Sequence, residues 1–351
     1  MLEGNNEIKW INCAKFVAII AVLTDHTAGT LYANYRIILA SYFSVSLFII
    51  ISGMLSFLSI EKHQLSWFVT FVRASRNIVV AYLFANFIYL IYTQRGFDFK
   101  VYLQYVINFN ISLPFYYVLL YLQLMLVSKP LYNIIKKVPK KYIVFGEIGI
   151  GGVILIISSW TTNHTNILNI YGGGGKLLGG TYLFLFYLGM LFSKHDIFRN
   201  LTLKKSVIIT VSSLVLCIFW WSFAFYHRLA LDAKLPFGNG VNPPSLTLGL
   251  MAVIMLFLSY GMFSLFQFTK YLNWITSFCS WIGKHTLYIF LFHRFFLDHI
   301  IHRFLATENI WLKRVLYFSI MIMGSILIEY AFHWLKKAFV GQHSLKNSEA
   351  S

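Results

Sequence analysis

Charged residues, prolines and cysteines are all scarce in this sequence, and each shortage narrows the class of protein. Charged side chains make up 12% of the 351 residues, about half the share in soluble globular chains. Hydrophobic residues make up 58% and the mean hydropathy is +0.68, which excludes a soluble domain and a disordered chain. The three cysteines, Cys13, Cys217 and Cys279, lie in or beside apolar segments. This placement predicts packed thiols and excludes a disulfide scaffold and a cysteine zinc site.

The apolar residues gather in ten blocks of helical length. Because a helix needs about 20 mostly apolar residues to cross a hydrocarbon core, we expect an all-α, polytopic membrane protein with about ten transmembrane helices. The approximate blocks are 9–29, 37–60, 67–92, 114–135, 141–160, 180–194, 205–227, 243–269, 281–304 and 311–338. The block at 180–194 is short for a span. We expect a single transmembrane domain over residues 1–340, followed by a short cytoplasmic tail over 341–351.

The basic residues predict the orientation of the chain. The formal net charge is +17, but the charges are scattered over loops, so nucleic acid is not an expected partner. One set of alternate loops holds 18 Lys and Arg and the other holds 10, with Lys15 inside the first block. The richer side is cytoplasmic by the positive-inside rule. We therefore expect a multi-pass protein of the plasma membrane, surrounded by lipid, with both termini in the cytoplasm.

The first block contains three ionisable residues, Lys15, Asp25 and His26. Such groups are expensive inside a membrane helix and by default mark a functional site. Lys15 and His26 are eleven residues apart, which on a helix is about 20° more than three full turns and ~16 Å along the axis. Both therefore lie on one face. The alternative is a snorkelling lysine and an interfacial histidine, which are common at helix ends.

Other ionisable residues lie inside later blocks. Glu329 precedes His333 by one helical turn, so the two side chains are within contact range, either in a site or as a helix-packing pair. Glu147 is expected to pair with a basic residue of a neighbouring helix. The histidines near residue 300 have no cysteine close to them in the sequence, and we expect no metal site there. The stretch YGGGGKLLGGTY lacks the spacing of a phosphate-binding loop and is expected to be a flexible outer loop.

Several motifs occur in a recognisable order. The first block has a basic residue, ten residues, and then His26. The second block contains SVSLFIIISGMLSF, with Phe48, Ser52 and Gly53 as Phe-x-x-x-Ser-Gly. It is followed by WFVTFVRASRNIVVAYLF, FYYVLLYLQLMLVSKPL, TYLFLFYLGMLFSK and WIGKHTLYIFLFHRFF. From Trp10 to about Lys337, this series resembles the acyltransferase-3 family of integral membrane acyltransferases. Two departures are Lys15 where the family has arginine, which loses the planar fork of a guanidinium, and a tyrosine for the usual tryptophan in the fourth motif.

The resemblance implies an O-acetyltransferase-like enzyme. It implies an acyl-CoA donor, usually acetyl-CoA, that enters from the cytoplasm, and no permanently bound cofactor. The acceptor would be a hydroxyl of a cell-surface or lipid-linked glycan. His26 would act as a general base or accept the acyl group itself, and Asp25 would orient it. The expected donor-binding residues are Lys15, Arg73 and Arg76, and the expected residues of the site wall are Ser52, His293 and Glu329.

Two other functions are compatible with a polytopic chain. A transporter exporting a polysaccharide or a small solute would use the buried charges to line a path. The sequence has no repeated pair of broken helices, which disfavours this interpretation. A membrane sensor or scaffold would have no need of Lys15, Asp25 and His26 inside one helix.

Overall fold

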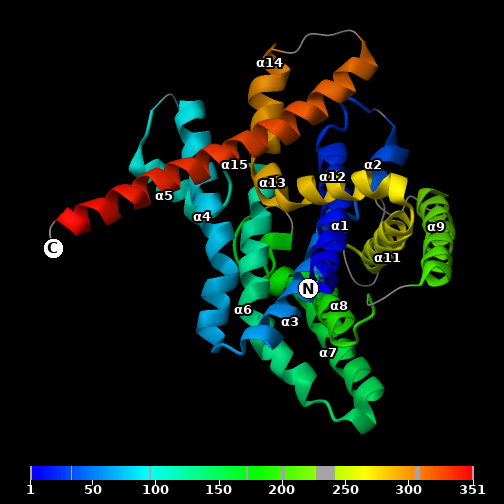
Figure 1. Ribbon diagram of the computed structural model, residues 1–351. Coiled ribbons are helices and arrows are strands. Elements are labelled where there is room, and N and C mark those ends of the chain that lie inside the picture. Colours follow the sequence, from blue (N-terminus) through cyan, green and yellow to red (C-terminus); the bar gives the residue numbers. More distant parts are fainter. Residues whose placement is uncertain are drawn as a thin grey trace. The chain divides into compact units, whose positions relative to one another are not determined.

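The computed structural model describes residues 2–32, 34–94, 96–170, 173–198, 202–226, 242–304 and 309–349. Within these ranges the chain forms helices joined by turns, and its β-pairing is confined to two isolated bridges, Ala28–Tyr32 and Asn166–Lys176 (Figure 1). The all-α prediction is therefore confirmed. The chain divides into two compact units, Met1–Lys284 and His285–Ser351, and the predicted domain over residues 1–340 includes parts of both.

The first unit contains eleven of the described α-helices. In chain order they are α1 (Leu2–His26), α2 (Tyr35–Ser41), α3 (Ser44–His63), α4 (Trp67–Gln94), α5 (Phe99–Asn108), α6 (Tyr116–Lys137), α7 (Ile143–His164), α8 (Tyr182–Lys194), α9 (Leu203–Tyr226), α11 (Leu246–Phe268) and α12 (Asn273–Lys284). Short 3₁₀ turns lie at Leu113–Phe115, Lys140–Tyr142, Gly173–Gly175, Leu177–Gly179 and Lys270–Leu272.

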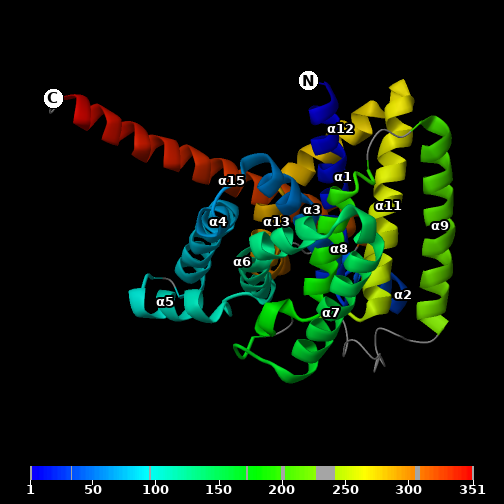
Figure 2. The same cartoon turned by 90° about the horizontal axis from the view of Figure 1, so that it is seen from below.

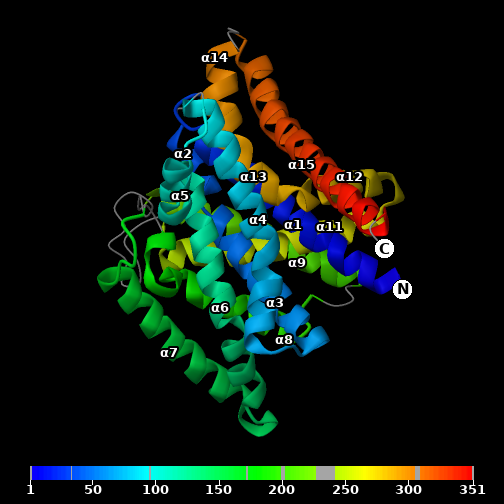
Figure 3. The same cartoon turned by 90° about the vertical axis from the view of Figure 1, so that its left-hand side faces the viewer.

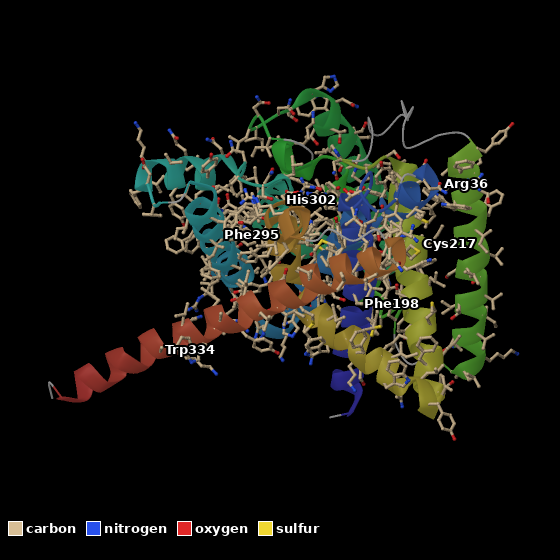
Figure 4. The ribbon with its side chains drawn as sticks, turned by 90° about the horizontal axis from the view of Figure 1, so that it is seen from above. Arg36, Phe198, Cys217, Phe295, His302 and Trp334 are labelled. Carbon is tan, nitrogen blue, oxygen red and sulfur yellow. The ribbon has the colours of Figure 1, made fainter. Side chains whose placement is uncertain are left out.

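The second unit contains α13 (Thr286–Phe295), a π-helical turn η6 (Phe296–Ile301), α14 (His302–Phe304) and α15 (Ile310–Glu349). Helix α13 packs against α15. Figure 4 labels Phe295 and His302, the residues that flank the π-helical turn. Helix α15 continues through most of the predicted tail, to Glu349.

Seven segments among the described residues are long and apolar enough to cross a membrane. They are Arg36–His63, Trp67–Thr93, Leu113–Lys137, Ile143–His164, Leu203–Tyr226, Leu246–Phe268 and Ile310–Ala338. The chain is therefore a multi-pass membrane protein, while the count of about ten stays a prediction. The other three predicted blocks are helical as well, but α1 carries Lys9, Lys15 and Asp25, and α8 has only 13 residues. The third, 281–304, is interrupted between α12 and α13.

Helix α3 is the centre of the first unit. It packs against α1, α6, α8 and α11, and Figure 3 shows α3 beside α8. Two glycines bring α3 and α8 together: a Cβ on Gly53 would lie 2.1 Å from the carbonyl oxygen of Phe186, and one on Gly189 would lie 2.0 Å from that of Ile50. Small residues allow this close backbone approach in membrane helix pairs. The glycine of the Ser-Gly motif is therefore a packing residue.

Helices α1 and α3 run antiparallel. They pack side by side, and residues 27–43, which include the short α2, connect the end of one to the start of the other. The last turn of α3 therefore lies at the same end of the bundle as the start of α1. In Figure 2 the N-terminus is at the top of the view, and α2 and α5 lie toward the bottom.

Helix α12 fixes the middle of α1. A Cβ on Gly283 would lie 1.9 Å from the carbonyl oxygen of Asn12, and the Cys13 thiol donates to the carbonyl of Thr276 at 3.3 Å. The sequence blocks predicted a helix beginning at 281, but α12 begins at Asn273. Thr276 and Ser280 are buried in α12 while Trp274 and Phe278 are exposed, so hydropathy alone does not mark this helix.

The glycine-rich stretch after α7 is packed rather than free. Gly173–Gly175 is buried, and a Cβ on Gly174 would lie 2.2 Å from the carbonyl oxygen of Tyr116. The Gln123 amide donates to the carbonyl of Gly174 at 3.0 Å and accepts from the Leu178 N–H at 2.8 Å. The expectation of a flexible loop is thus wrong for the described residues, because the glycines serve close contact with α6.

Candidate active site

Lys15, Asp25 and His26 lie on α1 and are half-buried. The residues between Lys15 and His26 on their shared face show where that face points: Ile19 is 0% and Val22 is 2% exposed. Val22 lies within about 40° of both ionisable residues around the helix axis. The face is therefore directed into the protein and not toward lipid. This orientation supports a site and disfavours a snorkelling lysine, whose stem would lie along an exposed surface.

His26 is the last residue of α1, and the chain turns immediately after it. The Thr27 hydroxyl donates to the carbonyl of Leu23 at 2.8 Å, and the Ala28 N–H donates to that of Asp25 at 3.1 Å. Gly29 follows with φ +81°, a left-handed conformation that glycine adopts without strain. These bonds fix the backbone at the end of α1, where His26 lies. The turn then leads into the segment that connects α1 to α2.

Helix α2 closes this end of the bundle against α9. The Arg36 guanidinium lies 4.4 Å from the centre of the Phe225 ring, and the Trp221 indole donates to the carbonyl of Arg36 at 3.2 Å. Figure 4 shows Arg36 beside the end of α9. Sequence patterns could not predict this contact, because it joins residues 185 positions apart.

Ser52 lies half-buried on α3, the helix that packs against α1. Its hydroxyl donates to the carbonyl of Phe48 at 2.8 Å, a bond from a helical serine to the carbonyl four residues earlier. The Phe48 ring in turn contacts the Tyr117 ring of α6, with centroids 6.3 Å apart. The Phe-x-x-x-Ser-Gly motif is therefore explained locally by this hydrogen bond and by the close approach at Gly53.

A pocket of about 170 Å³ lies between the end of α3, the start of α4 and α6. Arg73, one of the predicted donor-binding residues, lines it together with His63. Its hydroxyl-bearing lining residues are Ser56, Ser59, Thr70 and Ser128. Arg76 is exposed on α4 and is not among the lining residues. The pocket offers cationic and hydroxyl groups and no lining carboxylate, so it can hold an anion.

The carboxylate of Glu61, which follows the pocket residue Ile60 in the sequence, is held by other partners. Glu61 Oε1 pairs with Lys136 Nζ at 2.8 Å, and Glu61 Oε2 accepts from the Tyr132 hydroxyl. Gln64, in a left-handed conformation at φ +46°, ends α3 and donates to the Tyr132 hydroxyl at 3.0 Å. This network ties α3 to α6 and satisfies the Glu61 carboxylate without involving Arg73.

Glu147 forms the buried ion pair that the sequence predicted. Glu147 Oε1 lies 2.6 Å from Lys194 Nζ, with side-chain exposures of 9% and 12%. His195 Nε2 lies 2.7 Å from Glu147 Oε2, and Lys194 also donates to the carbonyl of Ile135 at 2.9 Å. The cluster joins α7, α8 and α6, so it stabilises the first unit.

The second unit contains the two other predicted wall residues. His293 is 0% exposed, and its Nδ1 lies 2.8 Å from the carbonyl oxygen of Phe290, so it acts there as a donor. Glu329 Oε1 lies 3.8 Å from His333 Nε2, which confirms the predicted contact. Its other oxygen lies 2.8 Å from His285 Nδ1. The sequence missed His285 as the closer partner, since 44 residues separate it from Glu329.

Comparison with protein families agrees with these features. A family model described as an acyltransferase domain, Acyl_transf_3, matches residues 8–334 and thus extends over both units. No curated protein and no solved structure matches the chain. The match includes α1 with Lys15 and His26, the α3–α4 segment with Ser52 and Arg73, and the second unit to within a few residues of the end of its apolar part. The chain therefore belongs to the acyltransferase-3 family and is a multi-pass membrane acyltransferase.

Proposed function

We propose that this acyltransferase moves an acyl group, normally acetyl, from cytoplasmic acyl-CoA to a hydroxyl of a cell-surface or lipid-linked glycan. The observation that carries the proposal is the position of two sites on antiparallel helices. The cationic pocket with Arg73 lies at the C-terminal end of α3, and His26 lies at the C-terminal end of α1. The two sites are therefore at opposite ends of the helix pair, as a donor from one side and an acceptor from the other require.

The donor would bind along the bundle. Its phosphates would bind at Arg73, with Arg76 on the adjacent surface, through charge-assisted hydrogen bonds. The narrow pantetheine arm would extend past Lys15 toward His26. Helix α3 has 20 residues, so the two ends are ~30 Å apart at 1.5 Å per residue. Lys15, ~16 Å from His26 along α1, lies about halfway and supplies a cation on the inward face.

The chemistry follows from the type of residue at the outer end. His26 would take the proton of the acceptor hydroxyl while the oxygen attacks the thioester carbonyl. The new C–O ester bond forms, the C–S bond breaks, and the CoA thiolate leaves and is protonated. In the alternative order, His26 would first accept the acyl group on its ring nitrogen and then pass it to the hydroxyl. Asp25 would hold the imidazole or a bound water in place.

The orientation is part of the proposal. The excess of basic residues on alternate loops supports cytoplasmic termini and a plasma-membrane location. Under this orientation the Arg73 pocket opens to the cytoplasm, where acyl-CoA is made. His26 then lies toward the outer leaflet, where a lipid-linked or cell-surface glycan is accessible.

The proposal is tested with purified protein in detergent and radiolabelled acetyl-CoA. We expect acyl-CoA turnover that increases when a glycan acceptor is added, with label appearing in the acceptor. Label retained on the protein after acid quenching would indicate the acyl-histidine route. A protein that shows no acyl-CoA turnover but carries glycan across proteoliposomes would be a transporter, and the proposed reaction would be wrong.

A further inference from the structure

Arg36 of α2 is an exposed arginine whose conformation is restricted by three contacts. Its backbone N–H donates to the Asn34 side chain at 2.9 Å, and its carbonyl accepts from the Trp221 indole at 3.2 Å. Its guanidinium lies 4.4 Å from the centre of the Phe225 ring. A long exposed side chain loses conformational freedom when it binds a ligand. Because these contacts already restrict Arg36, a ligand that binds it meets a smaller entropic cost.

The contact with Phe225 leaves the hydrogen-bonding capacity of the guanidinium unused. A cation–π contact acts on the charge and satisfies none of the five N–H donors with an oxygen. In the part of the chain that the structure describes, the Arg36 guanidinium has no hydrogen-bond or ion-pair partner. The ligand that matches these donors is an oxyanion, because two parallel N–H groups of a guanidinium bind two oxygens of a carboxylate or a phosphate.

Two aromatic rings of α9 lie beside this cation. Trp221 and Phe225 are half-buried and one helical turn apart, and their ring centroids lie 6.3 Å apart with an angle of 21° between the planes. We call these two rings and Arg36 the Arg36 platform. The face of an aromatic ring is negative, and the C–H groups on the face of a sugar ring pack against it. A sugar that carries an anionic group therefore matches both parts of the platform.

The Arg36 platform lies at the end of the bundle where the proposed acceptor arrives. Helix α2 packs against both α1 and α9, and Arg36 follows His26 by ten positions. Figure 4 shows Arg36 beside the end of α9. Because α9 is long and apolar enough to cross a membrane and ends at Tyr226, this end lies at a membrane surface. In the proposed orientation it is the outer surface, so the positive-inside rule does not account for Arg36.

We propose that the Arg36 platform binds the acceptor and that the acceptor glycan carries an anionic group. The inference rests on the proposed function, because it specifies the class of the acceptor. Arg36 would bind two oxygens of the anion, and the sugar ring would pack on Trp221 and Phe225, which holds the acceptor at the end of α1 that carries His26. The anion is the carboxylate of an acidic sugar or the phosphate that joins the glycan to its lipid. Both present the same pair of oxygens, and the experiment distinguishes them.

The test uses envelope glycans from the cells that make this protein, separated by anion exchange into an acidic and a neutral pool. Wild-type protein in detergent receives each pool with labelled acetyl-CoA, and we expect the label in the acidic pool. That pool is then treated in two ways, by reduction of its carboxyl groups or by mild acid that releases glycan from lipid phosphate. Loss of labelling after the first treatment identifies a carboxylate, and loss after the second identifies a phosphate. Equal labelling of the neutral pool, or no loss after either treatment, would overturn the proposal.

Variants then test the residues of the Arg36 platform. Arg36→Gln should raise the KM for the acidic pool by about tenfold to a hundredfold, the effect of one or two charge-assisted bonds. The effect on kcat should be smaller, because the bond is lost equally from the bound acceptor and the transition state. Arg36→Lys keeps the charge without the planar fork and should give an intermediate KM. Phe225→Leu should also raise the KM, since the guanidinium loses its support.

The control is Lys100→Gln, because Lys100 is an exposed basic residue of α5, at the same end of the bundle (Figure 2). The unfolding midpoint in detergent shows which variants are folded, and Arg36→Lys keeps the test informative if Arg36→Gln does not fold. An unchanged KM in folded Arg36 variants, or an equal rise in Lys100→Gln, would overturn the assignment while leaving the reaction in place. Acyl-CoA turnover without label in either pool would refute the glycan acceptor. Absence of any turnover would refute the proposed function, and this assignment would fall with it.

Discussion

Val22 distinguishes the two interpretations of the first helix. The spacing of Lys15 and His26 predicts a shared face, but spacing cannot say whether that face meets lipid or protein. With Val22 2% exposed between them, the face is turned inward. Likewise, the prediction for Glu147 specified a basic partner without naming it, because the identity of Lys194 depends on how α7 and α8 pack. The sequence thus predicts which residues share a face of one helix. It cannot predict which residues of two different helices form a pair, because that depends on how the helices pack.

Replacing the candidate base tests the site directly. His26→Ala should lower the rate of acyl transfer by about 10²–10⁴-fold, the usual contribution of a general base, with donor binding retained. The rate is measured with labelled acetyl-CoA and a glycan acceptor. His164→Ala is the matched control, because His164 is an exposed histidine at the end of α7. Acylation by His26→Ala at the wild-type rate would show that His26 is not the base.

Breaking the buried ion pair should destabilise the first unit. Lys194→Met leaves the Glu147 carboxylate with His195 as its remaining partner, in a place where its side chain is 9% exposed. Removing one partner of a buried pair costs about 3–5 kcal/mol, and His195 should keep the loss toward the lower value. The unfolding midpoint in detergent measures the change. The double variant Glu147→Gln with Lys194→Met should recover most of it, and equal loss in both would contradict the pairing.

At the scale of helices, long apolar blocks predicted most of the elements. Helices that are short or that mix apolar and polar residues were missed. Each of nine predicted blocks corresponds mainly to one helix. The tenth, 281–304, is divided between α12, α13 and η6. Helix α5 was not predicted, because its exposed apolar residues, such as Phe99 and Ile107, are spaced around a 10-residue amphipathic helix. A transmembrane span needs about 20 apolar residues, so a 10-residue helix does not stand out in a hydropathy window of that length.

The contact between α3 and α8 should not tolerate a methyl group. In Gly53→Ala and in Gly189→Ala the new Cβ would meet backbone carbonyl oxygens, which cannot move aside. We expect a loss of about 1–3 kcal/mol, as for other overpacked sites. Gly152→Ala on α7 is the control, because its Cβ would meet nothing within 4 Å, and alanine favours the helix by up to about 1 kcal/mol. If the thermal midpoints of Gly53→Ala and Gly152→Ala agree in detergent, the close packing is wrong.

On the scale of the first unit, the two candidate sites lie at opposite ends of antiparallel helices. The sequence predicted this separation through the positive-inside rule, since Arg73 was assigned to the basic side and His26 to the other. The pocket around Arg73 of α4 was not predictable, because it combines Ser56 and His63 of α3 with Ser128 of α6. Only packing brings them together.

Accessibility in intact cells checks the orientation. Single cysteines are introduced at Lys141 and at Ile167, which are exposed in the segments before and after α7, in a chain whose three cysteines are replaced. A membrane-impermeant maleimide should label Ile167→Cys from outside and Lys141→Cys only after the cells are opened. Labelling of both positions in intact cells would contradict the predicted topology.

The packed glycine segment after α7 has a practical consequence for anyone who modifies this protein. A run of glycines between two helices resembles a linker and invites the insertion of an affinity tag or a fluorescent reporter. Here the same residues hold the chain against Gln123 and the first turn of α6. A reporter inserted there would separate α6 from α8 and abolish expression of the folded protein. The exposed turn near Pro139, between α6 and α7, is the better place for one.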